Sequence, residues 1–197
     1  MQYKFREFNP HNATTKDRVA SAKWYKQSSD SVKRANDFKI DFKDKNSRSK
    51  MDLTCLGQMF VFFYDPKTKE RLQYYDTFPV VFVVKIERDG FIGLNLHYLP
   101  LMMRMQLMNA LYSLINNDNQ DKTTRLRLTN NILKSMSRFH YYKPCIKKYL
   151  FSHVKQKFLW IGPADWDKAL LLPTERFVKK NKSFVHTEST GKLNVQH

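Results

Sequence analysis

Ten basic side chains occupy the 36 residues from Lys122 to Lys157, and no Asp or Glu lies among them. Lysine and arginine neutralise phosphates, and each such contact adds to an affinity that falls as salt rises. An acid-free run of this kind repels itself unless an anion lies against it. We therefore predict a nucleic-acid-binding face in this segment. Its members are Lys122, Arg125, Arg127, Lys134, Arg138, Lys143, Lys147, Lys148, Lys155 and Lys157.

Aromatic residues are interleaved with these bases, at Phe139, Tyr141, Tyr142, Tyr149 and Phe151. An aromatic ring can stack on an exposed base at a strand end or in a single strand. A second interpretation stays open, in which the rings belong to the core and the bases are merely solvated. The helical spacing of Tyr149 with neighbouring apolar residues favours the core for that ring. No base-reading motif is present, so we expect binding through backbone charge and shape.

Patterns that carry catalysis or bind metals are missing from the sequence. It contains no P-loop, GxGxxG, GxSxG or HExxH motif. None of the six histidines is spaced with Cys, Asp or Glu as a zinc site requires. His97 lies between an expected strand and an expected helix, where a lone histidine is more often a hydrogen-bonded structural residue. We therefore predict a non-enzymatic protein with no metal, cofactor or small-molecule substrate.

The net charge of +17 is unevenly distributed along the chain. Residues 1–50 carry +7, residues 51–100 carry −1 and residues 101–197 carry +11. This asymmetry favours a polyanionic partner, with nucleic acid ahead of an anionic membrane or an acidic protein. A generally basic, soluble protein is the plainer interpretation. No apolar run approaches the roughly 20 residues of a membrane span, so no membrane partner is expected.

The neutral middle of the chain, Gly57 to Pro100, has the strongest β pattern and is the expected scaffold. An Asp65-Pro66 turn and an Asp89-Gly90 hairpin separate runs of β-branched and aromatic residues. These patterns predict a small antiparallel meander or SH3-like barrel, with a bulge or tight bend at Gly93. Its expected strands are Phe60–Tyr64, Glu70–Tyr75, Phe78–Ile86 and Phe91–Leu96.

Helices are expected to follow from Pro100 and to pack on this sheet, which makes the fold class α+β. Apolar residues at helical spacing predict helices over Leu101–Ile115 and Lys122–Ser137, and a third that Pro144 opens and that runs to Val154. A short strand is expected at Phe158–Ile161, followed by a turn into a short helix near Trp166.

Three regions are predicted along the chain. Residues 1–50 form a basic N-terminal arm, partly disordered or partner-bound, with a helix over Thr14–Asp30. Residues 51–180 form the core domain, with the sheet over 57–97 and the helices over 100–180. Residues 181–197 form a polar C-terminal tail.

Several motifs carry a family resemblance, namely those at 57–60, 64–67, 74–79, 90–100, 143–150 and 166–173. They resemble a virion protein family of T-even-like tailed phages, of the DNA end protector type. The likeness spans roughly Gly57 to Lys179, and GLNLHYLP at Gly93–Pro100 is its most specific part. The resemblance implies a non-enzymatic virion protein that sits on the packaged DNA terminus, near the portal or neck, and shields it from host exonuclease. It supplies no site residues.

Three functional hypotheses follow. The first is a virion protein, made in the bacterial host cytoplasm, that binds the packaged double-stranded DNA terminus without sequence preference. The second is a structural adaptor of the phage neck, tail or baseplate, whose arm threads between other phage structural proteins. The third is a nuclease, which needs converging acidic metal ligands that the sequence does not show.

Overall fold

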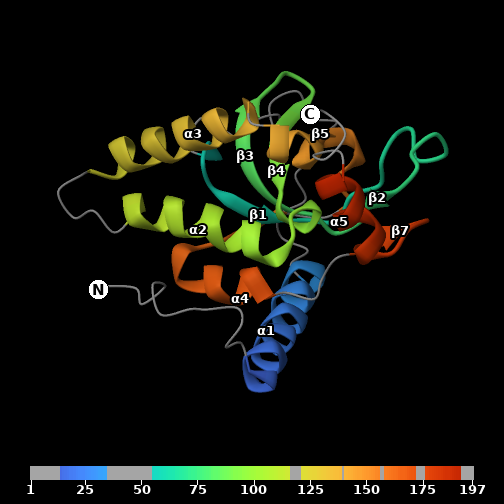
Figure 1. Ribbon diagram of the computed structural model, residues 1–197, viewed down its shortest axis with the longest axis horizontal. Coiled ribbons are helices and arrows are strands. Elements are labelled where there is room, and N and C mark those ends of the chain that lie inside the picture. Colours follow the sequence, from blue (N-terminus) through green and yellow to red (C-terminus); the bar gives the residue numbers. More distant parts are fainter. Residues whose placement is uncertain are drawn as a thin grey trace.

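The computed structural model describes residues 14–34, 55–115, 121–138, 140–155, 158–171 and 176–191. Within these ranges the fold is α+β, as predicted, with an antiparallel sheet and helices on one of its faces (Figure 1). The sheet is open, and no SH3-like barrel closes among the described residues. No helix in these ranges is both long enough and apolar enough to cross a membrane.

The main sheet has five strands and combines both halves of the chain. Every neighbouring pair is antiparallel. Their spatial order is β5 (Ile146–Leu150), β4 (Gly90–Asn95), β3 (Val80–Ile86), β1 (Met59–Val61) and β6 (Leu159–Ile161). A separate two-stranded sheet pairs β2 (Tyr75–Asp76) with β7 (Phe177–Val178). The predicted meander is therefore only the centre of the sheet, because both edge strands come from residues beyond 140.

The predicted hairpin at Asp89-Gly90 is confirmed, since Glu87 N donates to Gly90 O at 2.8 Å and β3 pairs with β4. The bulge expected at Gly93 on β4 lies instead on the paired strand β3. Val83 pairs with Gly93 and Lys85 with Ile92, so the extra residue is on β3. Gly93 is required for another reason, because the side chain of Val81 and the carbonyl oxygen of Phe82, both on β3, approach it too closely for a Cβ.

Two predicted elements are wrong. The helix expected from Pro144 to Val154 is instead a 3-10 turn, η6 (His140–Cys145), followed by β5. An apolar spacing over so few residues does not separate helix from strand, and the free edge of β4 supplies the hydrogen bonds that make it a strand. The strand expected over Glu70–Tyr75 is mostly a turn, with β2 only at its end.

The other helices form close to their predicted positions. They are α1 (Thr15–Arg34), α2 (Leu101–Ile115), α3 (Lys122–Arg138) and α4 (Trp166–Leu171). Thr14 caps α1, because its Oγ1 accepts from Asp17 N at 3.3 Å while Asp17 Oδ2 accepts from Thr14 N at 2.8 Å. One helix lies where only a polar tail was expected, α5 (Lys182–Gly191), and its Val185 is fully buried.

The sheet is buried on both faces. On one face Val80, Phe82 and Leu94 pack with residues of α2, α3 and α4, such as Leu111 and Leu133. On the other face the ring of Phe62 meets those of Phe91, Tyr149 and Phe158 edge to face, while Phe91 stacks on Tyr149. The ring centroid of Phe62 lies 4.9 Å from that of Phe158 and 5.2 Å from that of Tyr149. Aromatic rings in such arrangements stabilise the core beyond the area they bury. The fold thereby holds β5 firmly as an edge strand.

Gly93 provides a test of this close strand packing. A Cβ at Gly93 would collide with Val81 Cγ1 and lie 2.9 Å from Phe82 O. Gly93→Ala is therefore expected to lower the free energy of unfolding by about 1–3 kcal/mol, measured by urea denaturation.

Gly162→Ala is the matched control, because its Cβ would meet only the ring of Trp160, at 3.1 Å, and that side chain is 55% exposed and able to move. Its expected change is within about 0.5 kcal/mol. Equal losses in the two variants would contradict the assigned β3–β4 register.

Candidate nucleic-acid interface

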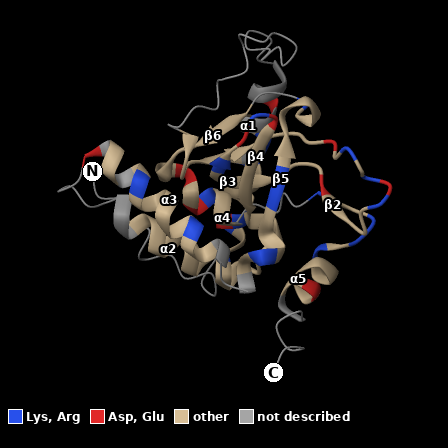
Figure 2. Cartoon of the chain, turned by 90° about the horizontal axis from the view of Figure 1, so that it is seen from above, with Lys and Arg blue, Asp and Glu red and all other residues tan. Residues whose placement is uncertain are grey.

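The ten predicted DNA-binding residues lie on several elements. Five belong to α3: Lys122, Arg125, Arg127, Lys134 and Arg138. Lys143 lies in η6, Lys147 and Lys148 on β5, and Lys155 follows the 3-10 turn η7 (Phe151–His153). Lys157 and the side chains of Lys122, Arg125 and Arg138 fall outside the described structure. Helix α3 packs against β3, and β4 lies between β3 and β5 in the sheet. The basic residues of α3 and those of β5 therefore do not lie on one helix face (Figure 2).

Carboxylates from the neutral middle of the chain approach the basic run. Lys148 Nζ lies 3.0 Å from both Glu87 Oε2 and Asp89 Oδ1, and Lys155 Nζ lies 3.3 Å from Asp65 Oδ2. The hydrogen bonds to Asp89 and Glu87 raise the pKa of Lys148. The argument that this run repels itself is therefore wrong for these two lysines, because the acids come from other elements. Such exposed pairs are weak, so a phosphate can replace the carboxylates.

Most of the interleaved aromatic residues that the structure describes belong to the core. Tyr149 is 3% exposed and Tyr142 is 8% exposed, while Phe151 packs partly buried on the second core cluster. The core interpretation is therefore confirmed for these three rings. Phe139 and the side chain of Tyr141 lie outside the described structure.

A buried hydrogen-bond network forms where β2, β4 and β5 meet. The Asp76 carboxylate accepts from Phe78 N at 3.0 Å and from Asn95 Nδ2 at 3.1 Å, and it lies 2.6 Å from His97 Nδ1. Asn95 also donates to Tyr149 Oη at 3.0 Å and accepts from His97 N at 2.9 Å. The network thus holds the short strand β2 against the main sheet.

Helices α2 and α5 support this network from outside. The carbonyl oxygen of His97, in the 3-10 turn η5 (Leu96–Tyr98), accepts from Arg104 Nη2 at 3.1 Å and from His186 Nε2 at 2.8 Å. Arg104 is itself buried and also donates from Nε to Leu99 O at 2.7 Å. The prediction that His97 is a hydrogen-bonded structural residue is confirmed.

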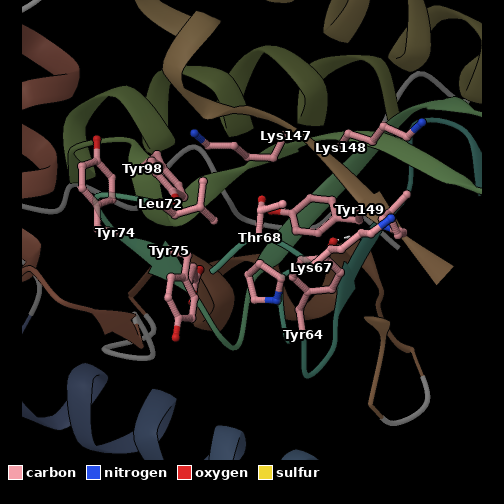
Figure 3. Close-up of a pocket in the computed structure, with 13 residues that line it drawn as sticks. Tyr64, Lys67, Thr68, Leu72, Tyr74, Tyr75, Tyr98, Lys147, Lys148 and Tyr149 are labelled. Carbon is pink, nitrogen blue, oxygen red and sulfur yellow. Dashed lines mark hydrogen bonds between the residues drawn. The ribbon is translucent and has the colours of Figure 1, made fainter. Parts of the chain in front are cut away.

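A pocket of about 380 Å³ opens beside this network, between the segment leading to β2 and the edge strand β5 (Figure 3). Its wall contains five tyrosines and three lysines: Tyr64, Tyr74, Tyr75, Tyr98, Tyr149, Lys67, Lys147 and Lys148. In Figure 3, Lys147 and Lys148 lie on one side and Tyr64 and Tyr75 on the other. The pocket therefore offers cations and aromatic rings together.

The charges of the pocket are well defined near neutral pH. Burial raises the pKa of Tyr98, and burial together with a hydrogen bond to Glu188 raises that of Tyr74, so both hydroxyls stay protonated. Lys147 Nζ lies 4.4 Å from the centroid of the Tyr98 ring, which holds its charge at the wall. In the described ranges no group of three or more His, Cys, Asp or Glu residues is placed to hold a metal ion. The pocket therefore suits an aromatic anion.

A family model described as phage T4 terminal DNA protecting protein matches residues 8–192. The chain belongs to this family. The match confirms the resemblance seen in the sequence and extends it over α1 and α5. Members are phage structural proteins that protect DNA, not enzymes, and the family name implies DNA binding and association with the virion. Comparisons with curated proteins and with solved structures give no match.

The pocket of this DNA-protecting family member was not foreseen from the sequence. Lys147 and Lys148 were among the predicted residues, but Lys67, Tyr74 and Tyr75 were not. Asp76 was not predicted either. The available signal was that Asp76, Asn95 and His97 all lie inside motifs of the family resemblance, at Tyr74–Pro79 and Gly90–Pro100.

The hydrogen-bond network around Asp76 is expected to stabilise the fold. Asp76→Ala leaves His97, Asn95 and Phe78 N without their shared buried acceptor. Removing one partner of a buried pair is expected to lower the free energy of unfolding by about 3–5 kcal/mol, measured by chemical denaturation.

Asp65→Ala is the control, since it also removes one carboxylate, but from the exposed ion pairs with Lys69 and Lys155. The free energy of unfolding of Asp65→Ala is expected to fall by much less than that of Asp76→Ala. If the two variants were equally stable, the network would not be what holds β2 in place.

Proposed function

We propose that this protein binds the end of packaged phage DNA near the portal or neck and shields it from nucleases, without recognising base sequence. The observation that carries this proposal is the family match over residues 8–192. The net charge of +17 supports it, because a strongly basic protein is drawn to a phosphate backbone. Protection by this route needs no catalysis, since a nuclease that requires a free end is excluded by a protein seated on it.

The basic side chains supply the contact with the backbone. Arg127 on α3 and Lys143 in η6 are exposed, as is Lys148 on the edge strand. Lys148 and Lys155 reach DNA by exchanging carboxylates for phosphates. Contacts of this type fix position on the duplex and carry no sequence information. The basic positions are spread over α3, η6 and β5 rather than along a single groove-reading helix, and Figure 2 shows basic residues on both α3 and β5.

The test measures binding of the purified protein to a blunt linear duplex and to a closed circle of the same sequence, across a salt series. We expect the linear form to bind more tightly, with log K falling linearly as log salt rises, by about 0.9 for each phosphate neutralised. The bound linear form is also expected to resist a double-strand exonuclease.

A double variant tests the basic side chains. Arg127→Gln with Lys143→Gln is expected to weaken binding to both DNA forms and to reduce the salt slope by about 2, one for each contact. Arg18→Gln with Lys23→Gln is the matched control, because it removes the same two charge types from exposed positions of α1. It is expected to leave the slope closer to the wild-type value.

Two results would count against the proposal. Equal affinity for the linear and circular forms would leave a general DNA contact without end recognition. Absence of binding to either form at low salt would remove DNA as the direct partner, and would favour the adaptor hypothesis with the basic residues at a protein interface.

A further inference from the structure

The pocket beside β5 has two chemically different walls. The lysine wall consists of Lys147 and Lys148 on β5, joined at the mouth by Lys67. Lys67 is exposed and forms no ion pair within the part of the chain that the structure describes. The opposite wall carries Tyr64 and Tyr75 (Figure 3). Lysines that can reach a phosphate thus face rings that can stack on a base.

Tyr75 is the ring best placed to accept a stacking partner. It is half-buried on β2, and it makes no ring contact with the aromatic residues that the structure describes. By contrast, the neighbouring Tyr74 already packs against Tyr98, Phe177 and Phe184. A pocket tyrosine with an unpaired face is a site where a base can stack without regard to its identity.

Size and rigidity agree with a ligand of one nucleotide. Pockets that enclose small ligands measure about 300–1,000 Å³, and this pocket, at about 380 Å³, lies at the lower end. The Asp76–Asn95–His97 network fixes β2, and hence Tyr75, relative to β5. Asp76 reaches the pocket wall, but His97 and Asn95 engage its carboxylate.

We infer that this pocket takes the terminal nucleotide of the DNA, with its base against Tyr75 and its 5′-phosphate on Lys67 and Lys147. The inference rests on the proposed function and names the site that would perform it. The last base pair of a duplex is stacked on one side only, so it opens more readily than an internal pair. A closed circle has no such nucleotide, and the pocket therefore accounts for a preference for ends.

The experiment compares two synthetic DNA probes of equal length and sequence. One is a 5′-phosphorylated hairpin with a single blunt end, and the other is a dumbbell closed at both ends. The wild-type protein is expected to prefer the open hairpin. Tyr75→Ala and Lys67→Gln are each expected to reduce that preference by about tenfold, with little change in dumbbell affinity. Tyr75→Phe keeps the ring and is expected to stay within about twofold of the wild type.

A crosslinking measurement on the wild-type protein does not depend on any variant folding. 5-Iododeoxyuridine is placed either at the 5′ terminal position or in the middle of the duplex, and the irradiated adduct is mapped by peptide mass spectrometry. We expect the terminal probe to label the pocket peptides that contain Tyr75 or Tyr149, and the internal probe to label other peptides.

The outcomes separate the two proposals. If the wild type prefers the hairpin but Tyr75→Ala and Lys67→Gln keep that preference, or the terminal probe labels peptides away from the pocket, this inference is wrong and end protection stands. If the wild type does not distinguish hairpin from dumbbell, end recognition fails, and the pocket inference fails with it.

Discussion

The buried carboxylate of Asp76 is the constraint on which the pocket beside β5 depends. A carboxylate away from water must find partners, and here Phe78 N supplies one from the same segment while Asn95 and His97 supply two from the end of β4 and the turn after it. The strand β2 is only two residues long and could not hold a fixed position through its own ladder with β7. The network holds it together with the hydrogen bond from Tyr64 N to Thr77 O at 3.0 Å, and one wall of the pocket is held with it.

The sheet determines where the lysines lie. Because β5 is buried through Tyr149 against Phe62 and Phe91, its alternate residues Lys148 and Leu150 cannot exchange faces without losing that contact. β5 is also an edge strand, so Lys148 reaches solvent beside the acidic β3–β4 hairpin. Consecutive residues of a strand point to opposite sides, so Lys147 and Lys148 leave β5 on different sides although both line the pocket.

Local and periodic signals in the sequence predicted the central elements well. The apolar spacing that predicts α2 and the Asp89-Gly90 turn that predicts the hairpin are both signals between residues close in sequence. Both elements form as expected. The edge strand β5 was taken for a helix, because its true partner is an open edge more than 50 positions away. Asp76 and His97 are 21 positions apart, so no spacing rule joins them. The acids that meet Lys148 and Lys155 were hidden for the same reason, since they lie in the neutral stretch.

The ion pairs at the basic surface have a consequence for binding DNA. A lysine held by an exposed carboxylate keeps its charge and orientation in the free protein, yet the pair is weak enough for a phosphate to displace it. Lys148 between Glu87 and Asp89 is therefore preorganised, and its acids repel the backbone wherever the exchange is incomplete. A duplex that contacts such a lysine along its length is therefore also repelled by the neighbouring carboxylates. In the proposed complex, a terminal phosphate at Lys67 would displace no carboxylate there, because Lys67 forms no ion pair in the described part of the chain.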